Sequence, residues 1–388
     1  MKSSSVQKSN RVRSASWKLQ EPGWTDEVRS RLERLIKQGA GRGLPVVFDF
    51  DNTIVCGDIG EATLAVLARS GRLPFEKFPA SFFPPFRQAS GALVTAQTSS
   101  DLAEYYEAFL APTAHGTKDP TPLANGYALA AEVLEGLNPY QVVAATREAY
   151  ESGRPGEVRM IEVTPGKTRY PAPYFYPEMV ELLAKFLSHE FDVWIVSASN
   201  VWSVRWMLLH ALPPLLRAHG VRRSIRPDHV VGISTLLSDA DHRLYKDDLL
   251  VRELPAYARL EKLALERFRL TSRLQFPVPT YSGKIACILD QIGRQPYLGV
   301  GDSPGDLPMM KFSENRLWIA RLEKPAYQRA AAHALIETGP SRWICQPALN
   351  KGHPGFVSAP RQIPSLLGSV PGTVAESLRI WRGRLGAI

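Results

Sequence analysis

The chain has 388 residues, of which 44% are hydrophobic and 22% are charged, and its formal net charge is +9. This length predicts two or three domains with an ample apolar core, and no uncharged apolar run is long enough to span a membrane. Lysines and arginines are spread along the chain without a zinc-finger, helix-turn-helix or aromatic RNA-binding pattern, so we expect no nucleic-acid partner. The three cysteines are scattered, which excludes a disulfide framework and fits a reducing cytoplasm.

The N-terminal segment, residues 1–44, is predicted to be a basic tail followed by one helix. Residues 1–20 contain no acid and are rich in Ser, Lys and Arg, but they lack the apolar stretch of a secretory signal. Thr25, followed by Asp26 and Glu27, is typical of a helix start. The helix is expected to run to about residue 37.

The first core strand ends in two aspartates. Apolar residues 46–48 lead into Asp49 and Asp51, and Asn52 and Thr53 follow as a turn. Such a run is typical of a buried parallel strand, whose carboxyl end is where open α/β sheets build their sites. Because the two aspartates are two positions apart, their side chains leave the strand on the same side. Their mutual repulsion indicates a divalent cation between them.

A large insertion follows this strand, because residues 59–176 are far too many for a simple crossover connection. We predict that they form a mostly helical cap domain. The expected cap helices are 61–69, 99–110, 122–137 and 139–151. The segment 170–177 is rich in Pro and aromatic residues and is predicted to be the return hinge, after which a helix over 178–188 re-enters the core. Closure of such a lid would keep bulk water from the carboxylates.

Three further segments place polar side chains at the ends of apolar elements. A second apolar strand ends at Ser197, and Lys284 lies in the first turn of an apolar helix. A third strand, over 297–301, leads into Asp302, with Asp306 four residues on. Since the carboxyl ends of parallel strands meet at one edge of a sheet, these groups are expected to gather near the first two aspartates.

The remaining chain is predicted to comprise the end of the core and a C-terminal extension. A strand over 316–320 is predicted to be the last strand of the core, which comprises residues 45–58 and 177–325. Residues 326–388 are predicted to be a C-terminal extension that begins with a helix and contains a Pro- and Gly-rich loop over 351–372.

The motif segments, in this order, resemble those of the haloacid dehalogenase-like phosphohydrolases. Asp49 opens their DxDxT pattern, and Ser197 matches their strand-end Ser or Thr. Lys284 matches their lysine, and Asp302 opens their GDxxxD pattern. The resemblance covers roughly residues 45–325. It implies an α/β fold, namely a three-layer, Rossmann-like parallel-sheet core with a large, mostly helical cap inserted after the first motif strand.

These residue types suit the Mg²⁺-dependent hydrolysis of a phosphomonoester, namely a small phosphorylated metabolite. Asp49 can attack phosphorus to give an aspartyl-phosphate, and Asp51 can protonate the leaving oxygen and then activate water. Thr53, Ser197 and Lys284 are candidate phosphate-binding residues. The candidate Mg²⁺ ligands are Asp49, Asp51, Asp302 and Asp306.

The cap sets the substrate, and here the sequence leaves alternatives open. In the phosphoserine phosphatase-like subgroup an acidic residue after the DxDxT pattern faces a cationic amine, and Asp58 stands at the matching position, with Asp where Glu is usual. Ala198 and Ser199 stand where that subgroup has two glycines, so the chain looks more like the phosphorylcholine phosphatase-like enzymes of that branch. Aromatic residues of the cap and hinge can hold a quaternary ammonium or form the cap's own core. They are Phe82, Phe83, Phe86, Tyr105, Tyr106, Tyr174, Phe175 and Tyr176.

Phosphocholine is therefore the first substrate to test. Phosphoserine, phosphoethanolamine and a sugar phosphate are the alternatives, and a catalytically silent relative that binds a phospho-ligand is a further one. We expect no membrane partner, and the sequence leaves the oligomeric state open.

Overall fold

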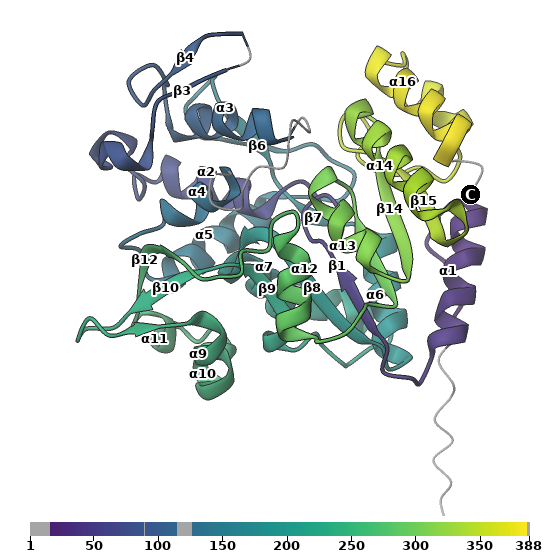
Figure 1. Ribbon diagram of the computed structural model, residues 1–388, viewed down its shortest axis with the longest axis horizontal. Coiled ribbons are helices and arrows are strands. Elements are labelled where there is room, and N and C mark those ends of the chain that lie inside the picture. Colours follow the sequence, from purple (N-terminus) through teal and green to yellow (C-terminus); the bar gives the residue numbers. More distant parts are fainter. Residues whose placement is uncertain (1–15, 89, 115–125, 386–388) are drawn as a thin grey trace, which may run out of the picture.

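A mostly parallel sheet of seven strands forms the centre of the computed structural model, which describes residues 16–88, 90–114 and 126–385. The strand order is β16-β15-β14-β13-β1-β8-β9 (Figure 1). Neighbouring strands pair in parallel except at one edge, where β16 runs antiparallel to β15. The strands are β1 (Pro45–Phe48), β8 (Asp192–Asn200), β9 (Val230–Ile233), β13 (Leu298–Gly301), β14 (Asn315–Arg321), β15 (Trp343–Leu349) and β16 (Gly355–Phe356). This arrangement confirms the predicted α/β fold class.

Helices cover both faces of this sheet. Alternate residues of β1 point to opposite faces, so Phe48 packs against Phe186, with ring centroids 5.9 Å apart, in the same core cluster as Ile36. On the other face, Val47 packs with Cys287 and Met309. The helices on the first face include α1 (Asp26–Gly39) and α6 (Pro177–Ser188), and those on the second include α12 (Gly283–Gln291), α13 (Leu307–Phe312) and α14 (Pro325–Thr338). The core therefore has the three layers that the sequence predicted.

The N-terminal helix α1 lies close to its predicted position. Thr25 caps it by accepting a hydrogen bond from the N–H of Val28 at 3.2 Å. Residues 1–15 of the predicted basic tail lie outside the described residues. Within the described residues, every helix is too short or too polar to cross a bilayer.

The sheet continues beyond the strand that the sequence predicted to be the last. β15 pairs in parallel with β14 over six positions, so the predicted boundary at residue 325 falls inside the sheet. Pro347 explains the error, because a proline within a run of residues argues against an interior strand. The structure accommodates it beside β16, whose ladder with β15 covers only Ala348 and Leu349.

The segment 59–176, which we call the cap, has more helix than strand among its described residues, which lie at the upper left of Figure 1. Its helices are α2 (Ile59–Arg69), α3 (Leu102–Ala114), α4 (Gly126–Glu132) and α5 (Pro139–Ser152). The helix expected over 122–137 is limited to α4, and residues 122–125 lie outside the described residues. At the hinge, β2 (Val55–Cys56) pairs antiparallel with β7 (Tyr174–Phe175).

A second module, residues 235–274, follows β9 and was not predicted from the sequence. Its sheet has the order β11-β10-β12 and is antiparallel. The elements are β10 (Thr235–Ser238), β11 (Leu244–Tyr245), α9 (Asp247–Glu253), α10 (Pro255–Ala258), α11 (Lys262–Leu265) and β12 (Arg269–Leu274). The cap is attached to this module, because the N–H of Gly136 donates to the carbonyl of Leu270 at 2.9 Å and the N–H of Leu270 donates to the carbonyl of Leu137 at 2.8 Å.

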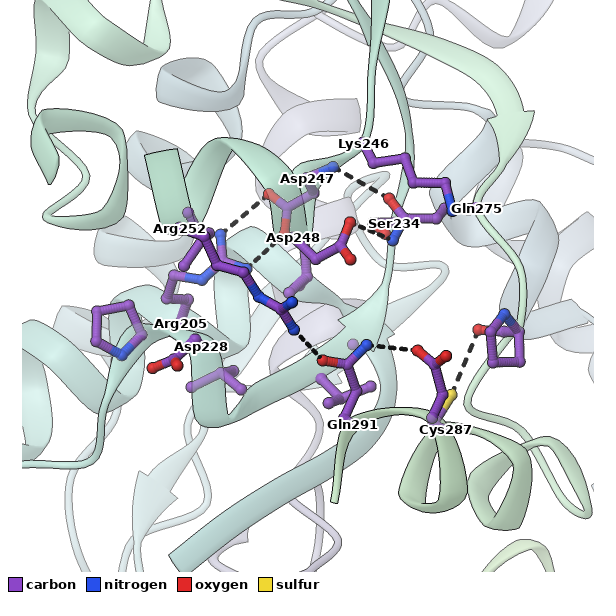
Figure 2. Close-up of a pocket in the computed structure, with 18 of the residues that line it drawn as sticks. Arg205, Asp228, Ser234, Lys246, Asp247, Asp248, Arg252, Gln275, Cys287 and Gln291 are labelled. Carbon is purple, nitrogen blue, oxygen red and sulfur yellow. Dashed lines mark hydrogen bonds and ion pairs between the residues drawn. The ribbon is translucent and has the colours of Figure 1, made fainter. Parts of the chain in front are cut away.

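An ion pair fixes the second module to the core. Both Nη atoms of Arg205, on α7 (Val201–Trp206), donate to the carboxylate of Asp247, at 3.1 and 2.5 Å. The hydroxyl of Tyr257 donates to the same carboxylate at 2.7 Å. Figure 2 shows this pair in a pocket between β9, α9 and α12, which none of the predicted site residues lines.

Candidate active site

The candidate site lies where the strand order reverses. From β1 the chain goes to β8 and β9 on one side, and it then returns to β13, β14 and β15 on the other. In open α/β sheets the crevice at this switch point, beyond the carboxyl ends of the strands, is the usual ligand site. Asp49 follows β1 here and Asp302 follows β13. The pocket is lined by Asp49, Asp51, Asn52, Asp58, Tyr127, Ala198, Ser199, Thr280, Tyr281, Lys284, Asp302, Ser303, Gly305, Asp306, Arg321 and Tyr327.

Asp49 is buried and held on both carboxylate oxygens. The Nζ of Lys284, in the first turn of α12, donates to Oδ1 at 2.6 Å, and Thr53 Oγ1 lies 3.0 Å from Oδ2. The same Thr53 hydroxyl lies 3.0 Å from Asp302 Oδ1, so Thr53 joins the two acids. Burial, together with the charge of Asp306, raises the pKa of Asp49 to about 8. The structure therefore brings four of the predicted site residues to one point.

Asp306 organises the turn after β13. Lys284 Nζ donates to its Oδ1 at 2.6 Å, while its Oδ2 accepts from the N–H groups of Asp302 and Ser303 at 3.1 and 3.0 Å. A Cβ at Gly301 would lie 2.4 Å from the Cβ of Asp306, so this close packing requires glycine. Asp306 thus orients Lys284 and the backbone that carries Asp302.

The donor set of this cluster fits a divalent cation. Asp49, Asp302 and Asp306 each offer a carboxylate oxygen within 4.8 Å of the others, and hard oxygen donors of this kind suit Mg²⁺. Burial also raises the pKa of Asp302, to about 6, although nearby Arg321 opposes that shift. Several crowded, buried carboxylates with raised pKa values are the electrostatic situation that a cation relieves. Asp51, the fourth predicted ligand, does not belong to this group of side chains.

Asp51 faces β8 and the start of α2 instead. Its carboxylate accepts hydrogen bonds from the N–H of Ile59 at 2.6 Å and from Ser199 Oγ at 2.7 Å. Burial, with the charges of Asp58 and Asp49, raises the pKa of Asp51 well above its ordinary value. A carboxyl group in this environment favours its protonated form, as a general acid requires.

Ser197 and Ser199 both point toward Asp51, but only one of them reaches the pocket. Ser197 is fully buried, its Oγ accepts from the N–H of Ser199 at 3.0 Å, and it lies 3.3 Å from Asp51 Oδ2. Ser199 lines the pocket, whereas Ser197 lies behind it. Ser197 was the serine predicted to bind phosphate, but Ser199 is the one that lines the pocket. The alternation of β8 gives the signal for the second serine, because residues two apart share a face.

Asp58 lines the pocket and also caps α2. Its Oδ1 accepts from the N–H of Glu61 at 2.9 Å and lies 3.4 Å from Ser199 Oγ, and burial raises its pKa. None of the eight aromatic residues expected to surround a cation is among the described residues that line this pocket. Phe83 and Phe86 instead pack on Tyr105, with ring centroids 5.0 and 5.7 Å apart.

Arg321 is the functional candidate that the sequence analysis missed. It is the last residue of β14, and its Nε lies 2.6 Å from Asp302 Oδ2. Its guanidinium carbon lies 5.3 Å from the centre of the Tyr327 ring. The rule that strand ends build the site would have identified Arg321, because it directly follows the predicted strand 316–320. Tyr127, from α4 of the cap, lines the same pocket, and no pattern in the sequence indicated it.

No known protein-family profile matches the sequence, and neither does any curated protein. A crystal structure of a conserved, functionally unknown protein from Anaerococcus prevotii is similar to this chain with a TM-score of 0.57 and 16% identity, over 89% of this chain and 97% of that one. A HAD family hydrolase from Salmonella enterica serovar Typhi aligns with a TM-score of 0.35 and 12% identity, over 76% of this chain and 72% of that one. The first likeness extends over nearly the whole fold, and it concerns the fold alone.

Proposed function

We propose that this protein is a Mg²⁺-dependent phosphomonoester hydrolase that acts through an aspartyl-phosphate at Asp49 on a small phosphorylated metabolite. The observation that carries the proposal is the environment of Asp49. It stands at the carboxyl end of the central strand, paired with Lys284 at 2.6 Å, in one group with Asp302 and Asp306. A nucleophilic carboxylate, a fixed ammonium group and oxygen ligands for a cation are what phosphoryl transfer requires.

The residues divide the reaction between them. A carboxylate oxygen of Asp49 attacks phosphorus, so the Asp49–phosphate bond forms as the bond from phosphorus to the leaving oxygen breaks. Asp51, held by Ile59 and Ser199, gives its proton to the leaving oxygen and then takes one from the water that hydrolyses the aspartyl-phosphate. Lys284 neutralises the phosphate oxygens. A bound Mg²⁺ would be held by the carboxylates of Asp49, Asp302 and Asp306 and would help to neutralise the charge of the phosphate.

The rest of the pocket lining bears on which leaving group the site accepts. Phosphocholine was expected because Asp58 and the cap aromatics could hold a quaternary ammonium. Asp58 caps α2 in the structure, and the aromatics that line the pocket are Tyr127, Tyr281 and Tyr327 instead. Arg321, a cation, lines the same pocket. A cation in the lining opposes a cationic leaving group, so these contacts support phosphocholine less than a phosphomonoester whose leaving group carries no positive charge.

Phosphate release from an aryl phosphate, with Mg²⁺ and with excess chelator, tests the proposal. Asp49→Asn keeps the shape of the nucleophile but removes its charge, so we expect turnover to fall by about three orders of magnitude or more. Asp241→Asn is the matched control, because Asp241 is exposed in the second module and its one ion pair within the described residues is with Arg243, at 3.8 Å. Retention of more than about a tenth of the turnover by Asp49→Asn would remove Asp49 from this role. A chain that binds phosphate but releases none from any phosphomonoester would be a non-catalytic phospho-ligand-binding protein.

A further inference from the structure

The guanidinium of Arg321 is mostly buried and lacks the hydrogen bonds that an arginine in such a place normally makes. Its side chain is 12% exposed, and its Nε is close to Asp302 Oδ2 but not aligned with it, so neither atom has a hydrogen-bond partner among the described residues. Across the same part of the chain, neither Nη atom donates a hydrogen bond to another residue. A guanidinium carries five N–H donors. Of these, the Nε donor is buried and unmet, which is unfavourable, and the residue lines the pocket, where a ligand can supply acceptors to the two Nη groups.

Arg321 and Lys284 approach the carboxylate cluster through different acids. Lys284 contacts Asp49 and Asp306, both at 2.6 Å, so it is the cation beside the nucleophile. Arg321 contacts Asp302 instead, and it lines the pocket together with Tyr127 from the cap. A phosphate bound at Asp49 is therefore served by Lys284. The guanidinium lies toward the cap, where the rest of the substrate would be.

We propose that Arg321 is a specificity-determining residue that binds a second anionic group, a carboxylate or phosphate, on the leaving group of the substrate. This inference rests on the proposed function. The planar fork of a guanidinium matches the paired oxygens of such anions, and with Nε turned to Asp302 the two Nη groups keep four N–H donors. A quaternary ammonium brings no acceptor and meets a like charge. The Tyr327 ring already has two cations over it, because Lys324 Nζ lies 5.8 Å from its centre as well.

Three phosphomonoesters with two-carbon leaving groups test this inference. Phosphoglycolate ends in a carboxylate, ethyl phosphate is neutral and phosphoethanolamine ends in an ammonium group. We expect kcat/KM for phosphoglycolate to exceed that for ethyl phosphate by about tenfold or more, and phosphoethanolamine to be no better than ethyl phosphate. Arg321→Met should bring the phosphoglycolate to ethyl phosphate ratio close to one. Lys324→Met, which removes a cation near the same ring but outside the pocket lining, should change that ratio by less than about threefold.

Arg321→Lys covers the case in which the methionine variant does not fold. It keeps the charge but loses the fork, so the ratio should still fall several-fold. Phosphoethanolamine equal to or better than phosphoglycolate would overturn the inference and favour Asp58 as the specificity residue. Equal rates on phosphoglycolate and ethyl phosphate would overturn it as well and would leave the phosphatase proposal standing.

A binding experiment separates the two proposals. Isothermal titration of Asp49→Asn with phosphoglycolate and ethyl phosphate measures recognition without turnover. About tenfold tighter binding of phosphoglycolate, lost on adding Arg321→Met, would support the anion site even in a chain with no phosphatase activity. Equal binding of the two ligands would overturn the anion site whatever the activity.

Discussion

Two buried arginine–aspartate pairs lie on different sides of the core and differ in how completely their polar atoms are bonded. Arg205 and Asp247 form a bidentate contact at 3.1 and 2.5 Å (Figure 2). The hydroxyl of Tyr257 donates a third hydrogen bond to the same carboxylate. Arg321 and Asp302 are equally close through one pair of atoms, at 2.6 Å, but that contact is not an aligned hydrogen bond. The first pair leaves Arg205 Nε as its one atom without a partner among the described residues, whereas in the second pair both of the contacting atoms, Arg321 Nε and Asp302 Oδ2, lack one.

The difference separates structural from functional charge. A buried ion pair with most of its hydrogen bonds made specifies how two elements fit together, here α7 and α9, and losing one partner is costly. A buried pair with unmet donors and acceptors is tolerated where a ligand completes it. The pocket of Figure 2 is therefore interpreted as a structural joint, and the pocket at the strand ends as the site of chemistry.

Of the changes that break one of these two pairs, Asp302→Asn is expected to have the largest effect, and that effect is on turnover. Asp302→Asn removes the charge of one of the three carboxylates proposed to hold Mg²⁺. We therefore expect Mg²⁺-dependent turnover to fall by about a hundredfold or more, or to require much more Mg²⁺. The free energy of unfolding should change less than in Asp247→Asn, because relief of the crowding among the carboxylates offsets the loss of the counter-ion of Arg321. Turnover across a Mg²⁺ titration, with urea unfolding of the same variant, measures both. Full wild-type activity in excess chelator would contradict the metal assignment.

Breaking the pair of Arg205 and Asp247 should instead lower the stability and leave the activity unchanged. Asp247→Asn leaves the buried guanidinium of Arg205 without its counter-ion, so the free energy of unfolding should fall by about 3–5 kcal/mol. Activity per folded molecule should be unchanged. Urea unfolding and active-site titration measure the two quantities. Asp228→Asn, which lines the same pocket but pairs with Arg226 at the surface, is the control. Lost activity in a fully folded Asp247→Asn protein would show that the joint acts on the site.

A smaller effect is expected from pH in the metal-free protein. The pKa of Asp49 is raised to about 8 and that of Asp302 to about 6, from 3.8. The folded chain therefore binds these protons more tightly than the unfolded chain, and their stabilising contribution is complete below about pH 4 and is lost as the pH rises through about 6 and 8. We expect the melting temperature in chelator to fall as the pH rises through this range, and excess Mg²⁺ to remove most of the fall. A smaller slope in Asp49→Asn is the control. A melting temperature that rises in chelator would contradict the assignment.

The sequence predicted the parts of this comparison unequally. The cluster around Asp49 could be predicted because each of its acids ends a strand or follows one closely, and strand ends meet at one edge of a parallel sheet. Arg321 followed the same rule but was missed, because it carries no motif. The carboxylate of Asp51 does not join the three-carboxylate group around Asp49, because it accepts hydrogen bonds from the N–H of Ile59 and from Ser199 Oγ.

Other parts had weaker local signals. The second module was not predicted, because β11 spans only Leu244–Tyr245 and its helices are four to seven residues long. β15 was missed because Pro347 opposes a strand assignment. The aromatic residues of the cap were open to two interpretations in the sequence. Tertiary packing decides between them, and it places Phe83 and Phe86 around Tyr105.

The two backbone hydrogen bonds that join Gly136 and Leu137 to Leu270 have a mechanical consequence. The cap is attached to the rest of the molecule at the β2–β7 hinge and again at β12, and Thr146 adds a hydroxyl contact to Ser203 at 2.7 Å. A segment attached at one end can rotate as a rigid body, whereas one attached at several points can only bend between them. We therefore expect the entrance to the pocket to behave as an aperture of nearly constant width. Under the proposed function, such an aperture would admit small phosphoesters and exclude phosphorylated proteins by size.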